Sequence, residues 1–428
     1  MLNKKLILIF LLLAIVVFGS SACTQQDVSP VTASAREMQS PADLQMKKAG
    51  ELVNKIPGSA KSHVQLAAAI LSKVRETGDY SLNRRAEESL GKALAIEPEN
   101  FDAQILQTQI YLSEHKFREG LELAKKLESA NPDSAAVMAA VVDAQTELGQ
   151  YDEAVKSAQK FVDLRPNSAS YTRVAHLRSL HGDVKGAIEA RQLALRIADP
   201  ADKEGLAWFN SELGKEYLIA GRSAEAESAF DKALEIFPDY HWALAGKGKV
   251  LAGRGEYDNA IEIFEKLTSR VPQSDRAIFL GDLYKIVGRN SDAQKIYDEA
   301  VKRERESSLG DMHRIALYWA DHDTNLDEAL DVAQQDRAVN NDLLASDTLA
   351  WCLYKKGSYT EAKKYMAEAI RLKTKNAMFY YHLGMIENAL GNKAEAVRNL
   401  KLAVEINPAF DLLQAGIARQ KLEELGRK

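Results

Sequence analysis

The sequence contains little cysteine and little proline, and its positive charge is dispersed. Cys23 and Cys352 are too few for a disulfide framework or a zinc site. Ten prolines in 428 residues, with 7% aromatic residues, favour helix over sheet. Lysine and arginine never form a run longer than two, and residues 23–428 carry a formal charge near −7. Because phosphate binding needs a concentrated basic surface, a nucleic-acid partner is not expected.

Motifs of catalysis are also missing. The stretch Gly246-Lys247-Gly248-Lys249 falls inside a predicted helix with no preceding strand, so it is not a phosphate loop. Neither a Gly-x-Ser-x-Gly elbow nor a His-Glu-x-x-His motif is present. His176 and His181 fall on different helix faces, and no histidine pair has ligand spacing. We therefore predict no catalytic residue, no metal, no cofactor and no small-molecule substrate.

The N-terminal residues 1–22 are predicted to be an export signal. Lys4 and Lys5 precede an apolar run, Leu6 to Phe18, that is shorter than the roughly 20 residues of a spanning helix. Ser20-Ser21-Ala22-Cys23 then resembles a bacterial lipobox, in which the cysteine becomes lipidated. Simple cleavage after Ala22 and an uncleaved anchor are the alternatives.

Residues 23–46 are rich in Gln, Ser, Thr and Ala and contain Pro30 and Pro41. They show no apolar period, so we predict a flexible tether. Together with a lipidated Cys23, this predicts an extracytoplasmic protein held on a membrane by lipid. Cys352 would then have no disulfide partner and is expected to be a small buried apolar residue.

The prolines of the remaining chain reveal a repeat of 34 residues. That spacing separates successive members of the series Pro98, Pro132, Pro166 and Pro200, and it separates Pro238 from Pro272. Pro408 lies four such periods after Pro272. A fixed period of this length indicates stacked supersecondary units.

Each period contains two helical patterns, as residues 207–240 illustrate. The apolar face of the first is formed by Leu213, Gly214 and Tyr217, and that of the second by Ala226, Phe230 and Ala233. Gly221 ends the first helix and Pro238 stops the second. Gly214 lets the two backbones approach, and Phe230 fills the gap beside it.

This pattern resembles the tetratricopeptide repeat, a helix–turn–helix unit. The resemblance covers about 62–408, and the matching positions recur at Gly149, Tyr151 and Ala154; Gly248, Gly255, Tyr257, Ala260 and Phe264; Leu280, Gly281, Tyr284, Gly288, Ala293, Tyr297 and Ala300; Gly357, Tyr359, Ala362 and Ala369; and Leu383, Gly384, Gly391, Ala396 and Ala403. The eighth repeat, about 308–342, lacks the expected glycines. The resemblance implies an all-α, right-handed α-solenoid of about ten repeats over 47–408, and a polar-backed terminal helix within 409–428 is predicted to cap it.

The resemblance also implies that the first helix of each repeat lines a concave groove. Its groove-facing positions supply the candidate binding residues Trp208, Ser211, Lys215, Trp242, Lys249, Asp282, Lys285, His313, Asp347, Trp351, Tyr354, Lys355, Tyr381, Met385 and Asn388. Packing between repeats is the alternative role for these rings, and for Trp319 packing is expected.

Aromatic rings and polar groups that bind backbone amides suit a groove for a peptide. We therefore predict a non-enzymatic scaffold that binds a protein or peptide partner. Its expected role is in envelope assembly or secretion. The alternative is an accessory protein that binds glycan or peptidoglycan through its aromatic residues.

Overall fold

The structure is a computed structural model that describes residues 40–306 and 312–427, which belong to one compact unit, Ser40–Lys428. The predicted export signal, Cys23 and most of the predicted tether lie outside the described residues. Within them the chain forms 22 α-helices, one 3₁₀ helix and no strand. The all-α solenoid prediction is confirmed.

Twenty of the described helices pair into ten hairpins. The first helices are α2 (Ala60–Thr77), α4 (Phe101–Ser113), α6 (Ala135–Glu147), α8 (Ser168–Leu180), α10 (Lys203–Ile219), α12 (His241–Gly253), α14 (Ser274–Ile286), α16 (Met312–Asp321), α18 (Leu343–Lys355) and α20 (Ala377–Ala389). The second helices are α3 (Asn83–Ile96), α5 (Phe117–Ala130), α7 (Tyr151–Leu164), α9 (Val184–Arg196), α11 (Ser223–Ile236), α13 (Tyr257–Arg270), α15 (Asn290–Glu306), α17 (Leu326–Val339), α19 (Tyr359–Ala369) and α21 (Lys393–Ile406).

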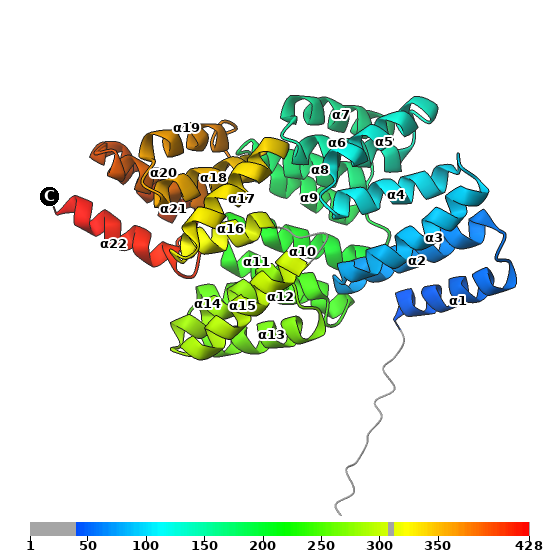
Figure 1. The fold of residues 1–428 in the computed structure, drawn as a ribbon, viewed down its shortest axis with the longest axis horizontal. Coiled ribbons are helices and arrows are strands. Elements are labelled where there is room, and N and C mark those ends of the chain that lie inside the picture. Colours follow the sequence, from blue (N-terminus) through cyan, green and yellow to red (C-terminus); the bar gives the residue numbers. More distant parts are fainter. Residues whose placement is uncertain (1–39, 307–311, 428) are drawn as a thin grey trace, which may run out of the picture. The chain divides into compact units, whose positions relative to one another are not determined.

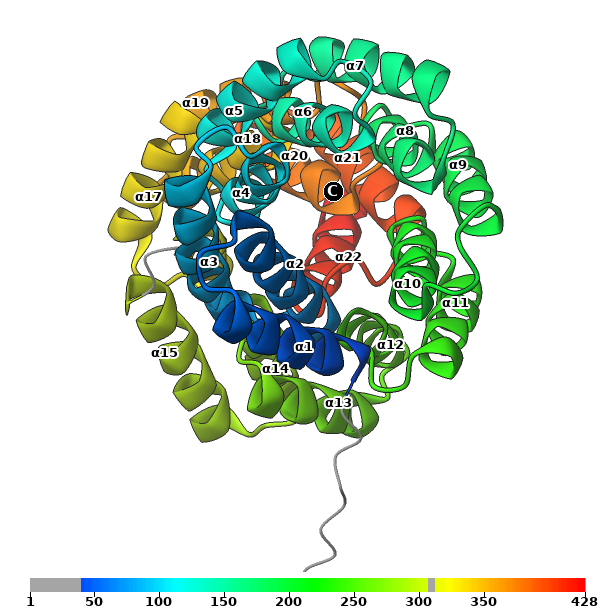
Figure 2. The same ribbon diagram turned by 90° about the vertical axis from the view of Figure 1, so that its right-hand side faces the viewer.

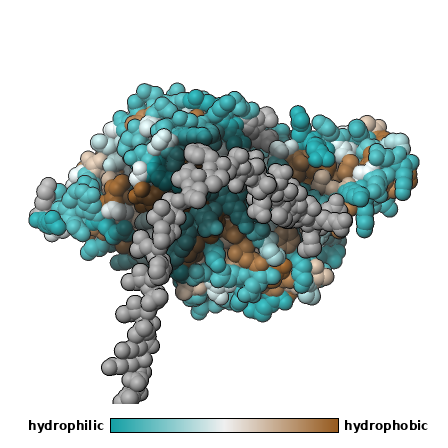
Figure 3. Space-filling model, turned by 90° about the horizontal axis from the view of Figure 1, so that it is seen from below, coloured by the Kyte–Doolittle hydropathy of each residue, from teal (hydrophilic) through white to brown (hydrophobic). Residues whose placement is uncertain are grey.

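Successive hairpins stack along the chain (Figure 1), with first helices forming an inner ring and second helices an outer one (Figure 2). Three further elements complete the unit: α1 (Pro41–Lys55), η1 (Tyr80–Leu82) between α2 and α3, and α22 (Gln414–Gly426). The face of the molecule seen in Figure 3 is largely hydrophilic. The inner helices are the ones that carry all of the predicted groove residues.

Glycines in the inner helices let aromatic side chains of the outer helices pack closely. A Cβ added to Gly214 would lie 2.6 Å from the ring of Phe230, and Gly246 of the next hairpin faces the same ring. Gly281 meets the Tyr297 ring in the same way. Phe230 is 2% exposed, so this packing buries a large ring between two hairpins. The steric role predicted for Gly214 is confirmed.

A second kind of contact joins hairpins that are five units apart. Gly149, Gly182 and Gly221, in the turns after α6, α8 and α10, abut the backbone of Asn341, Lys373 and Ile406 at the ends of later hairpins. A Cβ on Gly221 would lie 2.7 Å from the carbonyl oxygen of Ile406. We call these three contacts the inter-turn seam. They show that one turn of the solenoid rests directly on the next.

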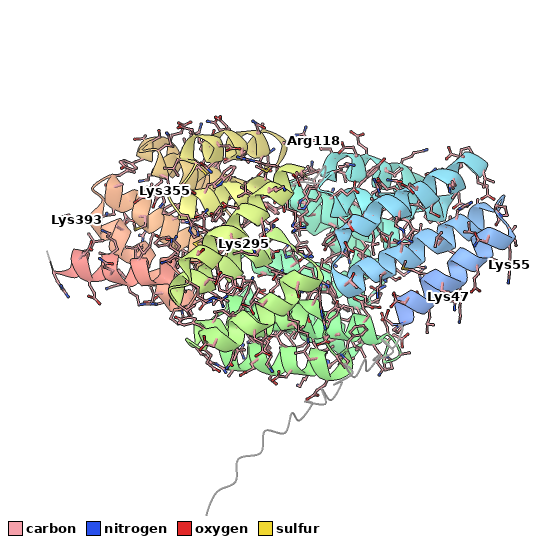
Figure 4. All side chains as sticks on the ribbon, turned by 60° about the horizontal axis from the view of Figure 1, so that its bottom comes forward. Lys47, Lys55, Arg118, Lys295, Lys355 and Lys393 are labelled. Atoms are coloured by element: carbon pink, nitrogen blue, oxygen red, sulfur yellow. The ribbon has the colours of Figure 1, made fainter. Side chains whose placement is uncertain are left out.

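Hydrogen bonds reinforce the inter-turn seam. The side-chain amide of Asn407 donates to the carbonyl of Leu218 at 3.0 Å, and the Thr374 hydroxyl donates to that of Leu180. Earlier in the chain, the guanidinium of Arg118 on α5, labelled in Figure 4, donates to the Val339 carbonyl at 2.9 Å.

The first hairpin makes the equivalent contact with the chain near residues 241 and 273. Gln273 donates from its side-chain amide to the carbonyl of Gly78 at 2.7 Å, and His241 Nε2 lies 3.1 Å from the carbonyl oxygen of Arg75. The wall of the solenoid is therefore tied from turn to turn along its length.

One boundary differs from the sequence-based expectation, and two expected features take a definite form. Helix α1 begins at Pro41, inside the predicted tether, because the Ser40 side chain caps it together with Asp43. The turn of the eighth hairpin replaces glycine with Asp323 and Asn325, which both take positive φ, 54° and 47°. The predicted cap is present as α22 and begins at Gln414.

Candidate functional site

Five predicted groove residues lie on accessible surface of the middle inner helices. Lys215 on α10, Lys249 on α12 and Lys285 on α14 are exposed, and Trp208 on α10 is half-buried. Trp242 at the start of α12 keeps 38% of its surface exposed, which is high for the largest side chain. These side chains can contact a partner without rearrangement.

Charged side chains from successive inner helices influence one another. Enclosure at the end of α6, together with Asp342 and Asp143, raises the pKa of Glu147 to about 7, and Lys215 opposes this. Enclosure also lowers the pKa of His176 on α8 to about 4, again with a contribution from Lys215. Since α6, α8 and α10 belong to three different hairpins, Lys215 influences charged side chains beyond its own hairpin.

Lys249 lies in the same enclosed but solvent-accessible region. Its surroundings lower its pKa because enclosure disfavours the ammonium charge. Asp275 counters this effect, whereas Lys215, Arg314 and Arg276 strengthen it. Three cations and one carboxylate therefore act on Lys249, and the carboxylate of Asp275 has the largest single effect among them.

Aromatic rings lie next to these cations. The Arg276 guanidinium is 5.8 Å from the centroid of Trp242, and the Lys249 ammonium is 5.6 Å from that of Phe279. The Trp242 ring also packs 4.9 Å from that of His241. Such contacts hold rings and cations in place before any partner arrives.

The sequence analysis missed Glu147, His176 and Arg314 as members of this surface. His176 occupies the ninth position of its repeat, as Lys215 and Lys249 do. The stripe of groove-facing positions would therefore have identified it. Instead, it was considered as a metal ligand.

Six predicted groove residues are buried, and for these the prediction is wrong. Each is at most 8% exposed: Ser211, Asp282, Asp347, Trp351, Tyr381 and Met385. Except for Ser211 and Asp282, they come from the last two hairpins. Trp319, expected to pack, is 1% exposed, and Cys352 is fully buried; these expectations are confirmed.

Trp351 shows why the last hairpins differ. Its ring stacks between those of Tyr354 at 4.7 Å and His382 at 4.1 Å. Its indole N–H donates to Asp321 Oδ1 at 2.8 Å. The alternative role, packing between hairpins, is thus the correct one for this residue.

The chain itself covers the inner face near Tyr381. The Tyr381 hydroxyl donates to Gln414 Oε1 at 2.7 Å, and the Phe410 ring lies 5.6 Å from the Tyr381 ring. Asp411 accepts from the backbone N–H of Gln414 at 2.7 Å, which orders the approach to α22. This C-terminal segment, residues 407–414, occupies a place that the sequence analysis assigned to a partner.

The other predicted groove residues on α16, α18 and α20 are either paired with a carboxylate or half-buried. His313 Nδ1 lies 2.9 Å from Asp336 Oδ2, and Lys355 is 2.9 Å from Asp323. Tyr354 and Asn388 are half-buried. The candidate site therefore narrows to the middle hairpins.

Two other kinds of site were considered in the sequence: a metal centre and a membrane-spanning helix. Across residues 40–306 and 312–427, no group of three or more His, Cys, Asp or Glu side chains is placed to hold a metal ion. In the same stretches no helix combines the length and apolar character needed to cross a membrane.

Comparison with known proteins agrees with the helical-hairpin solenoid. Tetratricopeptide repeat family models match residues 105–169, 217–278 and 348–409. A solved structure of the human IFIT1 dimer with m7Gppp-AAAA has a TM-score of 0.50, 18% sequence identity, and coverage of 77% of this chain and 76% of that chain. At this identity the likeness shows the fold alone.

Curated relatives share segments of the chain. Cellulose synthase operon protein C of Pseudomonas fluorescens (strain SBW25) is 22% identical over 249 residues, which cover 56% of this chain and 19% of that protein. TPR repeat-containing protein MJ0940 of Methanocaldococcus jannaschii is 32% identical over 91 residues, which cover 21% and 29%. The chain thus spans less than a third of the length of these relatives.

The stacked hairpins, the recurring glycine and aromatic positions and an inner face with accessible rings and cations define a helical-repeat scaffold. The chain is a tetratricopeptide repeat protein. Proteins of this family generally bind protein partners, and their repeat fold is generally not catalytic.

Proposed function

We propose that the chain is a non-enzymatic scaffold that binds a protein or peptide partner on the inner face of its middle hairpins. The observation that supports this most directly is Trp242, a large ring left 38% exposed beside Arg276 on an inner helix. Large rings in such positions are common contact residues, because they bury much area at little entropic cost.

The proposal includes attachment to a membrane through a lipid on Cys23, in an extracytoplasmic compartment. A role in envelope assembly or secretion would suit such a tethered scaffold. The lipobox-like Ser20-Ser21-Ala22-Cys23 supports the attachment. Its test is membrane fractionation and labelled-palmitate incorporation in the native host. The Cys23→Ser variant should lose both label and membrane association; if Cys23→Ser stays membrane-bound and the parent takes up no label, the lipid anchor is rejected.

Site-specific photocrosslinking in cells tests partner binding. A photoreactive amino acid at Trp242 should give a crosslinked protein product. The same amino acid at Lys232, exposed on the outer helix α11, should not. Equal products from both positions, or none from Trp242, would contradict binding at the inner face.

A glycan or peptidoglycan ligand is the second candidate. The exposed Trp242 could stack on a sugar ring, and one relative is named for a cellulose synthase operon. Sedimentation of the protein with isolated cell-wall material distinguishes a glycan ligand from a protein or peptide partner. Co-sedimentation that is lost in Trp242→Ala would favour the glycan.

A further inference from the structure

Helix α1 has an outer face that the rest of the solenoid leaves exposed. Among the described helices, α2 is the one that α1 packs against extensively, and Ala42 and Ala49 of α1 are buried. An α-helix turns by about 100° per residue. Leu44, Lys48 and Lys55 therefore lie on a face turned away from Ala42 and Ala49, and all three are exposed. This face can contact a partner without rearrangement of the fold.

Four exposed lysines lie on this outer face or next to it. They are Lys47, Lys48, Lys55 and Lys61. Lys47 and Lys55 project from α1 at the edge of the molecule (Figure 4). In the described part of the chain, none of the four has a carboxylate oxygen within 4.0 Å of its ammonium group. An anionic partner would therefore meet lysines that are not already held in ion pairs.

Carboxylates near these lysines are fewer. Residues 41–61 contain two, Glu51 on the outer face of α1 and Asp43, which lies 2.9 Å from Lys73 of α2. Lys73 also pairs with Glu76 at 2.9 Å, so this ion-paired group of α2 leaves the balance unchanged. Four lysines and two carboxylates give residues 41–61 a formal charge of +2, in a chain whose overall formal charge is −5. The local charge thus has the opposite sign to that of the whole chain.

The helix at the other end of the solenoid has a different charge pattern. Large apolar side chains are exposed at both ends: Leu44 and Ile56 at α1, by 44% and 51%, and Ile417 on α22, by 41%. At α22, however, Lys421 lies 2.5 Å from Glu424, and Arg427 lies 3.3 Å from Glu423. A terminal repeat needs a polar outer face for solubility, and the paired charges of α22 supply one. The lysines of α1 remain available for an anionic partner.

The place of α1 in the chain favours a membrane as that partner. Ser40, which caps α1, follows Cys23 by 17 residues. A fully extended chain of that length spans at most about 60 Å. A lipid on Cys23 would therefore hold α1 near the bilayer, where its lysines meet headgroup phosphates at a high effective concentration. Every other described helix lies further along the chain from Cys23.

We call Leu44, Lys47, Lys48, Lys55, Ile56 and Lys61 the α1 patch. We propose that the α1 patch binds the surface of a bilayer that contains anionic phospholipids. The lysine ammonium groups contact headgroup phosphates, and the side chains of Leu44 and Ile56 enter the boundary between headgroups and acyl chains. This inference rests on the proposed lipid attachment, to which it adds a second contact. Two contacts fix the orientation of the solenoid on the membrane, whereas a single anchor leaves it free to rotate.

Co-sedimentation with sucrose-loaded vesicles tests the α1 patch without the lipid anchor. The protein is the chain from Ser40 to Lys428, one compact unit that contains every described helix and lacks Cys23. One set of vesicles is phosphatidylcholine alone, and the other is an equal mixture of phosphatidylcholine and phosphatidylglycerol. Both are used at low and at high salt, because salt screens contacts between exposed charges.

Two matched variants locate the binding surface. Lys48→Gln/Lys55→Gln removes two lysines from the α1 patch. Lys156→Gln/Lys232→Gln removes two exposed lysines from the outer helices α7 and α11, so the change in total charge is the same. Circular dichroism checks that both variants keep the parent's helix content.

We expect the parent to bind the vesicles with phosphatidylglycerol about tenfold more tightly than those without it, and to lose most of this preference at high salt. Each lysine near an anionic surface strengthens binding roughly fivefold, so Lys48→Gln/Lys55→Gln should weaken it by about tenfold or more. The control variant should bind as the parent does. Ile56→Ser should weaken binding about threefold at either salt concentration, because it removes an apolar contact.

Equal binding to the two kinds of vesicle would overturn the proposal, and so would equal losses in the two double variants. A photoreactive amino acid at Lys48 gives a further outcome in cells. If it crosslinks to a protein and the vesicles are not bound, the partner of the α1 patch is a protein and the membrane contact is rejected.

The outcome is separate from that of the lipid anchor, because the chain from Ser40 lacks Cys23. If Cys23 takes up labelled palmitate and the vesicles are not bound, the anchor stands and the α1 patch is rejected as a membrane contact. If the vesicles are bound and Cys23 takes up no label, the lipid is rejected and the α1 patch binds membranes without it.

Discussion

The backbone N–H of Leu343 donates a 3.0 Å hydrogen bond to the hydroxyl oxygen of Tyr151, 192 residues earlier in the chain. Tyr151 begins α7 and is 5% exposed, and the Arg371 guanidinium lies 5.1 Å from its ring. One tyrosine thereby links two hairpins that lie in different turns of the solenoid, α6/α7 and α18/α19.

Tyr151→Phe should destabilise the protein by about 1–3 kcal/mol, because it leaves the buried N–H of Leu343 without an acceptor. Urea unfolding followed by circular dichroism measures the loss. Tyr359→Phe is the matched control: Tyr359 holds the same repeat position, is 37% exposed, and should cost about 0.5 kcal/mol or less. Equal losses in the two variants would show that the inter-turn hydrogen bond contributes nothing.

A pair of glycine substitutions separates backbone conformation from the inter-turn seam. Gly149 and Gly357 both have positive φ, 69° and 80°, so alanine at either costs about 1 kcal/mol. Gly357 has no atom within 4 Å of an added Cβ, whereas at Gly149 that Cβ would overlap the Asn341 carbonyl. Gly149→Ala should therefore lose at least twice as much stability.

Hydrogen exchange gives the matching local readout. Amides of residues 341–343 should exchange faster in Gly149→Ala and at the parent's rate in Gly357→Ala. If exchange at 341–343 is unchanged in Gly149→Ala, the inter-turn seam does not protect this segment.

Trp351→Ala should lower the free energy of unfolding. The side chain is 1% exposed and stacked between two rings, so its removal should cost about 3–5 kcal/mol. Trp242 is 38% exposed, so Trp242→Ala should lower the free energy of unfolding by about 1 kcal/mol or less. Thermal unfolding compares them, and a Trp351→Ala variant as stable as Trp242→Ala would contradict the burial of Trp351.

Glu147→Gln should stabilise the protein at high pH. The pKa of Glu147 is raised from 4.5 to about 7 in the folded protein, mainly by enclosure. A carboxyl whose pKa rises on folding weakens the fold as pH climbs from the unfolded to the folded value, and the loss is complete above the latter. The variant avoids this loss, so its advantage should grow from pH 4.5 to 7 and then remain constant.

Because Glu147 is solvent-accessible, we expect a gain of under about 1 kcal/mol. Urea unfolding at pH 5 and pH 8 measures it. Glu153→Gln on the exposed face of α7 controls for the loss of one negative charge. An advantage that is equal at both pH values would contradict the raised pKa.

Much of the fold could be predicted because each hairpin depends mainly on its neighbours. The close approach of Gly214 to Phe230 follows from positions within one repeat, and the period then multiplies it. The candidate site was predicted less well. Lys215, Trp242 and Lys249 are accessible as the stripe of groove-facing positions implies, but Trp351 and Tyr381 occupy the same stripe and are buried.

Those two residues are buried for reasons outside the repeat. Tyr381 is covered by Phe410 and Gln414. Both residues follow the last repeat, so the repeat pattern could not predict where they lie. Trp351 is fixed by Asp321, which belongs to the irregular eighth hairpin. A repeat pattern describes a typical unit, so it cannot identify where an atypical neighbour fills the groove.

The sequence by itself determined the hairpin, its period, its helix ends and the side of each helix that packs, since these follow from contacts within a few tens of residues. The tertiary structure alone decided which turns touch and which part of the inner face stays open. Those outcomes depend on small rotations between successive hairpins, which add up over six units until Tyr151 meets Leu343. No single repeat encodes that sum.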